Sequence, residues 1–272
     1  KAEARGVLKS LSQMGKQLGP IRLGSTILFI ILAVLMARFS WFTPLIQDAE
    51  RALYDMRVSV FAPEVEKEDR IVMIVYNEDT LKLTGQRSPV DRTILAQALE
   101  TIDKAGAKSI GIDILFTMPQ DDDALLVSSF NKMKTPTYLA YADPVTNPEI
   151  DFAEHEFLNE FVGQVKGKAV SKTSIRLETE SDGVARRWTA LPQGLPPFLA
   201  IALTKPNPEF AKNQGAIRYL VPTNPDMPVF DKFPIESFAD PATADMLQSF
   251  IKDKYVLIGG DFIDRDRFET PI

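Results

Sequence analysis

Four carboxylates in one short stretch are the residues of this chain most suited to chemistry. Residues 109–123 read SIGIDILFTMPQDDD, so Asp113 interrupts an apolar run, and Asp121, Asp122 and Asp123 follow a proline. A carboxylate within a buried strand needs a cation or several hydrogen bonds to offset its desolvation. Three adjacent carboxylates repel one another unless something offsets the repulsion. The stretch therefore contains either a site or a local structural feature that holds these charges.

The three consecutive aspartates have a local explanation and a chemical one. They precede a helical pattern, and carboxylates in the first turn of a helix cap its free N–H groups and gain about 0.3–1 kcal/mol each from the helix dipole. A hard cation also binds carboxylate oxygens, but consecutive side chains point in different directions and match no calcium-loop spacing. Local capping is the favoured interpretation, cation binding is the alternative, and no metal site is predicted.

Asp113 lies near the carboxyl end of a predicted strand, where open α/β sheets bind their ligands. Both faces of such a sheet are covered, so we expect Asp113 to be half-buried and paired with a basic residue. The candidate ligand-binding residues are Arg92, Asp113, Arg186 and Arg187. A structural ion pair is the alternative role for Asp113. On either view, replacing Asp113 should cost more stability or signalling than replacing any one of Asp121, Asp122 and Asp123.

The composition removes several kinds of chemistry. The chain has no cysteine and one histidine, His155, which lies in an acidic segment typical of an exposed helix turn. Thiolate chemistry is excluded, and serine–histidine–aspartate or zinc chemistry would have to use that one histidine. A hydrolase with paired carboxylates, Asp113 and Asp264, is a further alternative, but no nucleophile elbow or metal motif supports it. We predict no catalytic residue and no cofactor.

The elements that must position these residues alternate between strand and helix after residue 62. The predicted elements are strands at residues 70–76, 108–116 and 137–140, and helices at residues 91–105 and 122–132. Asp91 can cap the first of these helices, and Gly106 can end it. An alternation of this kind predicts parallel strands joined by right-handed helical crossovers.

The second half of the chain has a different character. The predicted elements are a hairpin of residues 169–179 and 183–189, a helix at 197–203, strands at 216–220 and 233–235, a helix at 243–251 and a closing strand at 254–259. The prolines of residues 191–234 indicate long surface loops. The predicted fold class is α/β, with a mixed, largely parallel sheet and flanking helices.

Residues 23–42 are long and apolar enough to cross a membrane as a helix. Arg38 lies near one end of the segment, and Trp41 and Phe42 suit a membrane interface. Residues 1–22 carry a net charge of +4, which leaves −10 for the rest of a chain whose total is −6. This asymmetry predicts a basic segment in the cytoplasm and an acidic domain outside. A cleaved signal peptide and a buried soluble helix are the alternatives.

A second, amphipathic helix is predicted directly after the span. Thr43 and Pro44 form a typical helix start, and apolar residues then recur at steps of three and four. The predicted organisation is a basic cytoplasmic segment (1–22), a transmembrane helix (23–42), a juxtamembrane helix (43–62) and an extracytoplasmic domain (63–272). One transmembrane helix therefore precedes the α/β sheet.

Several segments of the chain resemble, in order, the motifs of one known domain family. They are residues 50–57 (ERALYDMR), 71–81 (IVMIVYNEDTL), 106–116 (GAKSIGIDILF), 182–187 (DGVARR), and 255–259 (YVLIG) with Thr270 and Pro271. From about residue 45 to residue 272 the chain resembles a CHASE2 domain. It departs from that family at residues 87–92, which lack the usual tryptophans before the arginine, and at Asn77, which replaces an aspartate.

The resemblance to CHASE2 implies a sensor module of a bacterial receptor in the inner membrane, with the main domain on the periplasmic side. It also implies a longer polypeptide, in which further membrane helices and an output domain, such as a nucleotide cyclase or a protein kinase, follow. The segment itself is then not an enzyme. Expected partners are the lipid bilayer, a second copy in a homodimer, and a small ligand or envelope protein; the negative charge disfavours nucleic acid. An envelope scaffold that binds a protein partner is the alternative.

Overall fold

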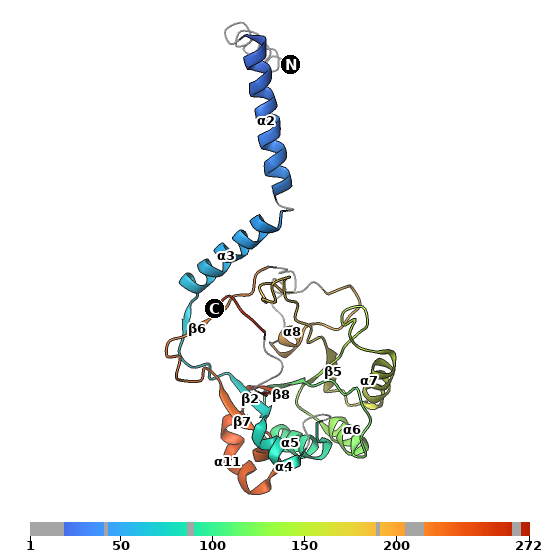
Figure 1. The fold of residues 1–272 in the computed structure, drawn as a ribbon. Coiled ribbons are helices and arrows are strands. Elements are labelled where there is room, and N and C mark those ends of the chain that lie inside the picture. Colours follow the sequence, from blue (N-terminus) through green and yellow to red (C-terminus); the bar gives the residue numbers. More distant parts are fainter. Residues whose placement is uncertain (1–18, 41–42, 86–89, 189–190, 205–214, 263–267) are drawn as a thin grey trace, which may run out of the picture. The chain divides into compact units, whose positions relative to one another are not determined.

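The computed structural model describes residues 19–40, 43–85, 90–188, 191–204, 215–262 and 268–272. The chain divides into two compact units, one up to Phe61 and the other from Ala62 to Ile272. In Figure 1 the described part of the first unit is helical, and the second contains a sheet with surrounding helices. Trp41, Phe42 and most of the basic segment 1–22 lie outside the described residues.

The first unit contains helices α2 (Pro20–Ser40) and α3 (Pro44–Phe61). Residues Ile21–Phe39 of α2 are long and apolar enough to cross a membrane. The start of α3 is as predicted, because the carbonyl oxygen of Thr43 accepts hydrogen bonds from the N–H groups of Ile46 and Gln47 at 3.1 and 3.2 Å. The prediction of one membrane-capable helix ahead of the α/β domain is confirmed.

A six-stranded sheet forms the centre of the second unit, with strand order β5-β4-β3-β8-β2-β7 and parallel pairing throughout. Its strands are β2 (Ile71–Tyr76), β3 (Ser109–Asp113), β4 (Thr137–Ala140), β5 (Val170–Thr173), β7 (Asp231–Pro234) and β8 (Tyr255–Gly260). Two short strands, β1 (Glu64–Val65) and β6 (Val221–Pro222), pair in a separate parallel ladder. The predicted α/β class with a largely parallel sheet is confirmed.

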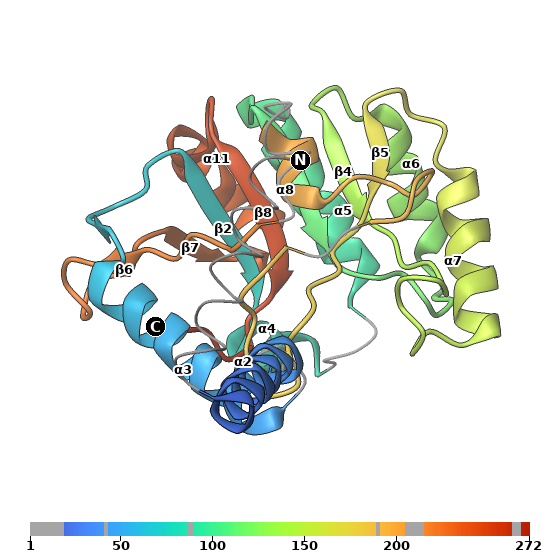
Figure 2. The same cartoon turned by 90° about the horizontal axis from the view of Figure 1, so that it is seen from above.

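The helices of the second unit lie mainly on one face of this sheet (Figure 2). They are α4 (Glu78–Thr84), α5 (Arg92–Ala105), α6 (Asp123–Lys132), α7 (Phe152–Gln164), α8 (Leu199–Thr204), α10 (Glu236–Ala239) and α11 (Pro241–Ile251). The sequence predicts α5, α6, α8 and α11. It does not predict α4 and α10, and it predicts only a helix turn where the 13 residues of α7 form.

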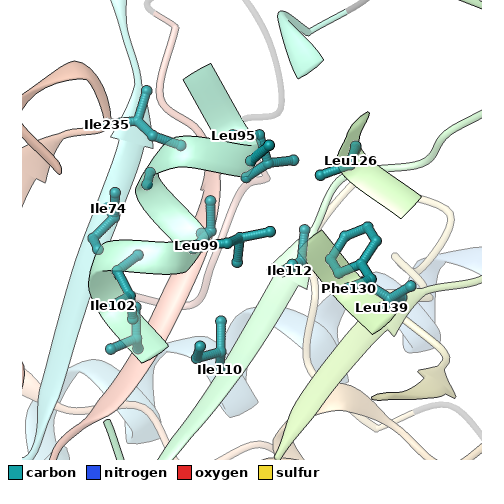
Figure 3. Close-up of a cluster of buried hydrophobic side chains, with 14 of the residues drawn as sticks. Ile74, Leu95, Leu99, Ile102, Ile110, Ile112, Leu126, Phe130, Leu139 and Ile235 are labelled. Carbon is teal, nitrogen blue, oxygen red and sulfur yellow. The ribbon is translucent and has the colours of Figure 1, made fainter. Parts of the chain in front are cut away.

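Helix α5 provides the central packing surface. The Asp91 side chain accepts a hydrogen bond from the N–H of Ile94 at 2.9 Å, and Gly106 ends the helix with a φ of 76°, as predicted. Figure 3 shows the fully buried side chains Leu95, Leu99 and Ile102 of α5 beside Ile74, Ile110 and Ile112 of the sheet. Burial of apolar surface between helix and sheet is therefore what holds this face together.

The predicted hairpin and one predicted strand are wrong. The turn at residues 181–183 forms, and the N–H of Gly183 donates to the carbonyl oxygen of Glu180 at 2.9 Å. Between residues 170 and 188, however, the two arms form no hairpin ladder, because residues 170–173 are β5 and pair in parallel with β4. Nor do the described residues 216–220 form the predicted strand, since Ala216 makes only one bridge, to Arg187.

The opposite face of the sheet carries the short helix α8, which packs on β3 and β4. Figure 1 shows α8 across the sheet from α5 and α11. Gly111 of β3 permits this close approach, because a Cβ atom there would lie 2.9 Å from side-chain carbons of both Leu199 and Leu203. Parallel sheets are normally covered on both faces. Helix α8 covers β3 and β4, and an opening lies above β2 and β8.

Candidate functional site

A cavity of about 410 Å³ lies on this second face of the sheet. Its floor consists of the side chains on one side of β2 and β8: Ile71, Met73, Val75, Tyr255 and Leu257. The alternate residues of the same strands point toward the helix-covered core and are buried, whereas most of the floor residues are only half-buried. One side of these strands packs into the core, and the other side forms a surface that can contact a ligand.

The walls of the cavity come from segments that are far apart in sequence. Residues 174–177 follow β5, Leu199 belongs to α8, and the rings of Trp188 and Phe198 have centroids 5.9 Å apart. The N–H of Leu199 donates to the carbonyl oxygen of Ser174 at 2.9 Å, which ties two of these segments together. A preformed, mostly apolar hollow with a few polar groups is typical of a small-molecule site.

The polar groups of the cavity follow the carboxyl ends of β3, β5 and β8. Asp113 ends β3 and is in register with Gly259 of β8, and both residues line the cavity. Asp113 is exposed, so the expectation that it is half-buried is wrong. Arg176 follows β5 and also lines the cavity; its guanidinium donates hydrogen bonds to the carbonyl oxygen of Thr146 and to the carboxylate of Glu178. A carboxylate and a guanidinium thus accompany a largely apolar interior.

Arg92 is buried and is not among the residues that line this cavity. Its Nε donates to Oδ1 of Asp123 at 2.8 Å, and its two Nη atoms donate to the carbonyl oxygens of Val90 and Met118, each at 3.2 Å. The guanidinium carbon lies 4.6 Å from the centre of the Phe116 ring. Arg92 therefore makes a structural ion pair that joins the beginnings of α5 and α6.

The same contacts account for two of the three consecutive aspartates. Asp123 accepts the Arg92 hydrogen bond and a second from the N–H of Gln120 at 2.8 Å, and Asp122 accepts one from the hydroxyl of Thr93 at 2.9 Å. Asp122 occupies the N-cap position of α6, yet its side chain makes no capping hydrogen bond. Structural contacts explain these carboxylates, but they are mainly contacts with α5 and not the predicted helix caps.

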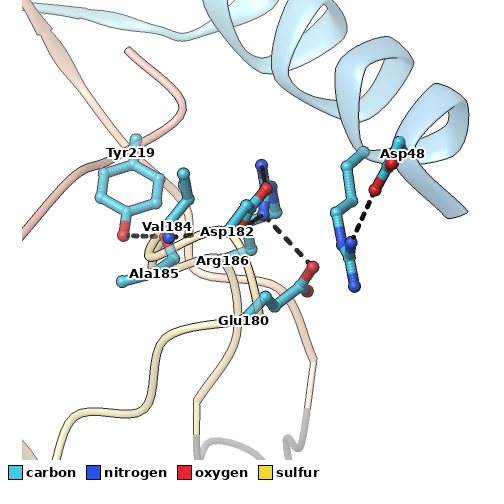
Figure 4. A network of polar contacts seen from close by, with 8 residues as sticks. Asp48, Glu180, Asp182, Val184, Ala185, Arg186 and Tyr219 are labelled. Carbon is cyan, nitrogen blue, oxygen red and sulfur yellow. Dashed lines mark hydrogen bonds and ion pairs between the residues drawn. The ribbon is translucent and has the colours of Figure 1, made fainter. Parts of the chain in front are cut away.

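Arg186 is a second buried arginine, and it pairs with carboxylates that are partly exposed (Figure 4). Its Nη atoms donate to the Asp182 carboxylate at 2.8 and 2.9 Å and to Glu180 at 3.2 Å. The hydrogen bonds from Arg186 lower the pKa of Asp182 from 3.8 to about 2. The hydroxyl of Tyr219 donates to the carbonyl oxygen of Ala185 at 2.6 Å. These contacts fix the turn at residues 181–183.

Arg187 is exposed, next to the buried Arg186. Of the four predicted ligand residues, Asp113 lines the cavity, whereas Arg92, Arg186 and Arg187 are not among its lining residues. The structure therefore does not bring the four together around this cavity. Within the described residues, Arg92 and Arg186 have structural ion pairs, and a ligand role for them remains a prediction.

Sequence reasoning assigned the floor of the cavity to strand packing alone. Two signals of a site were present in the sequence. Gly259 and Gly260 end an apolar strand without side chains that would cover the sheet there, and Trp188 is the single tryptophan after residue 42. Neither signal identifies a cavity without knowledge of which segments cover the second face.

The remaining candidate groups do not form a catalytic site among the described residues. Nε2 of His155 lies 3.2 Å from the hydroxyl of Tyr141 and 3.1 Å from Nδ2 of Asn159. In the described part of the chain, no group of three or more histidine, aspartate or glutamate side chains could hold a metal ion. Asp264 lies outside the described residues, so the paired-carboxylate hypothesis stays untested.

Comparison with known proteins identifies the family. The CHASE2 domain profile matches residues 27–272, which is most of the chain and includes the greater part of α2. The chain belongs to the CHASE2 domain family. No curated protein and no solved structure matches it significantly. CHASE2 domains are extracytoplasmic sensor domains and not catalytic ones, so this CHASE2 domain has a sensor role. The membrane-capable helix at Ile21–Phe39 is consistent with a membrane protein.

Proposed function

We propose that this CHASE2 domain is the periplasmic sensor region of a bacterial inner-membrane receptor, and that it passes a signal to a C-terminal nucleotide cyclase or protein kinase. The observation that carries the proposal is the family match from residue 27 to residue 272, which includes both a membrane-capable helix and the α/β domain. The charge difference between the basic segment 1–22 and the acidic remainder supports an extracytoplasmic domain.

The absence of native cysteine makes the topology directly testable. Two single-cysteine variants, Lys9→Cys in the basic segment and Glu160→Cys on the exposed side of α7, can be labelled with a membrane-impermeant maleimide on intact cells whose outer membrane has been permeabilised. Glu160→Cys should be labelled before lysis, and Lys9→Cys only after lysis. Protection of Glu160→Cys until lysis would contradict the proposal.

The output domain can be tested through the coding sequence. We expect the reading frame beyond Ile272 to encode further membrane helices and then a cyclase or kinase domain. A ligand shifts the equilibrium between two receptor conformations only if it binds them with different affinity. The receptor can pass that shift on only through a domain whose activity differs between the two conformations. A stop codon soon after one more span would instead favour an envelope scaffold.

We propose in addition that the receptor works as a homodimer. Large apolar side chains recur on one side of α3 at steps of three and four residues, and Leu53, Met56 and Val60 among them are more than half exposed. Two copies held in one bilayer would present these surfaces at the same height. Disulfide cross-linking of Leu53→Cys should therefore exceed that of Val58→Cys, which lies on the opposite side of the helix. Equal cross-linking would argue against a dimer contact at this surface.

A further inference from the structure

We propose that the cavity above β2 and β8 binds a small, uncharged and mostly apolar molecule. The inference rests on the proposed sensor function and names the chemical class of its ligand. Three properties of the cavity support it: the apolar floor, the volume together with an aromatic wall, and the balance of the charged groups that line it.

The floor of the cavity favours an apolar ligand. Ile71, Met73 and Leu257 are half-buried beside the part of the sheet on which α8 packs. In a parallel sheet, side chains in this position are normally covered by a helix. A ligand that covers them removes apolar surface from water, both on the floor and on the ligand itself. Each methylene group of the ligand that becomes buried should therefore tighten binding by roughly fourfold.

The volume and the walls of the cavity fit a small molecule. A cavity of about 410 Å³ lies in the range of drug-sized ligand sites. Trp188 and Phe198 provide two adjacent aromatic rings along one wall, and aromatic side chains offer a large apolar contact area. Leu199 and Leu203 of α8 also line the cavity. A ligand of this size would therefore contact β2, β8 and α8 together, three elements that are far apart in the sequence.

The charged groups of the cavity favour neither a cation nor an anion. Among the described residues that line it there is one acid, Asp113, and one base, Arg176, so the formal charges offset each other. Asp113 already takes part in a polar interaction within the chain. The guanidinium of Arg176 donates hydrogen bonds to Glu178 and to the carbonyl oxygen of Thr146. An ion that entered this apolar cavity would lose its hydration without a net attraction in return, so an uncharged ligand is favoured.

Trp188 allows binding to be measured directly by fluorescence. The chain has two tryptophans, so Trp41→Phe leaves Trp188 as the single indole. The full chain with this substitution can be placed in lipid nanodiscs and titrated with hexanol, octanol, octylammonium and octanoate, each at a known free concentration in water. We expect a saturable change in Trp188 emission with octanol, about 15-fold weaker binding of hexanol, and at least about tenfold weaker binding of each of the two ions.

Two leucine variants separate binding in the cavity from partition into lipid. Gly259→Leu places a side chain in the cavity, and a Cβ atom there meets its nearest neighbour at an ordinary 3.5 Å. Gly163→Leu adds the same side chain on the exposed part of α7, where the new Cβ meets no other segment within 4 Å. Gly259→Leu should abolish the saturable change with octanol, and Gly163→Leu should retain it.

A second pair of variants tests the floor without filling the cavity, and it decides the question if Gly259→Leu fails to fold. Met73→Gln replaces a thioether by an amide of similar length at a half-buried position of the floor. Met246→Gln makes the same change on α11, at a side chain that is 69% exposed. Met73→Gln should weaken octanol binding by about fivefold or more, because the amide must give up water when the ligand covers it. Met246→Gln should bind octanol like the parent.

Three results would each overturn the inference: no saturable change with octanol, binding of octylammonium or octanoate as tight as that of octanol, or equal octanol binding by Met73→Gln and Met246→Gln. Cysteine labelling reports separately on the proposed function, because the topology of the domain does not depend on what the cavity binds. A periplasmic domain whose cavity binds no octanol would therefore leave the proposed function standing and refute this ligand class alone.

Discussion

Arg92 is a charge placed inside the core, and its guanidinium makes an ion pair with the carboxylate of Asp123. The side chain of Arg92 is 1% exposed and that of Asp123 is 19% exposed. A buried cation that loses its carboxylate partner keeps the cost of desolvation without the compensating attraction. The two carbonyl oxygens that also accept hydrogen bonds from Arg92 offset only part of that loss.

Asp123→Asn should therefore lower the free energy of unfolding by about 3 kcal/mol, whereas Asp121→Asn, at an exposed position, should change it by less than about 0.5 kcal/mol. The sequence-based expectation placed the largest cost at Asp113. Chemical denaturation of Asp123→Asn, Asp121→Asn and Asp113→Asn measures the order. Equal midpoints for Asp123→Asn and Asp121→Asn would refute the structural role of the Arg92 ion pair.

The Asp182 carboxylate should make stability depend on pH in the acid range. Arg186 lowers its folded-state pKa to about 2 from an ordinary 3.8. Because the folded pKa is the lower one, the stabilisation is complete above about pH 3.8 and is lost as the pH falls toward about 2. Asp182→Asn should accordingly weaken the acid dependence of the unfolding midpoint over this interval. Asp226→Asn, in another exposed turn, is the control and should follow the parent chain.

At the scale of the elements, Gly111 determines how closely α8 can approach the sheet. An added Cβ atom would lie 2.9 Å from carbons of Leu199 and Leu203 and 3.1 Å from one of Leu257. Gly111→Ala should cost about 1–3 kcal/mol of stability, because α8 or these leucine side chains must move. Thermal unfolding measures the cost. Gly163→Ala, in an exposed helical position, is the control and should be neutral or stabilising by up to about 1 kcal/mol.

Elements with local signals could be predicted from sequence. Helix α5 has its cap at Asp91, an apolar stripe and Gly106 at its end, and all three are found as predicted. Helix α7 has a comparable local signal, a capping box between Asp151 and Glu154, and its 13 residues form where only a helix turn was predicted. The hairpin prediction was wrong for a physical reason. Asp182 and Gly183 do form a turn, but β5 pairs with β4, which lies some thirty residues earlier in the chain.

The candidate site was harder to predict than the helices, because it depends on contacts between residues that are far apart in the sequence. Asp113 was correctly placed at a strand end, yet two of its predicted basic partners make ion pairs with other carboxylates, Arg92 with Asp123 and Arg186 with Asp182. The cavity exists because α8 covers β3 and β4 and an opening lies above the neighbouring β2 and β8. No local sequence pattern in β2 or β8 predicts which face of the strand a helix will cover. That information lies in the packing of the whole second unit.

At the scale of the whole molecule, the two units require different surroundings. Apolar side chains of α2, among them Phe29 at 76% exposure, would face water unless a bilayer or another apolar surface covers them. The large buried core, in contrast, consists entirely of residues after Ala62, and so does the six-stranded sheet. A core contained within one unit is what independent folding requires.

Removal of residues 1–61 should therefore leave residues 62–272 soluble without detergent and able to unfold cooperatively, whereas the full chain should need lipid or detergent. The first residue that is kept decides the outcome, because β1 pairs with β6, and β2 lies between β8 and β7 and pairs with both. A truncation that starts at Asn77 deletes both strands and should not fold. Gel filtration and circular dichroism of the two truncated chains decide between these outcomes. Aggregation of residues 62–272 would show that the α/β core depends on the preceding helices.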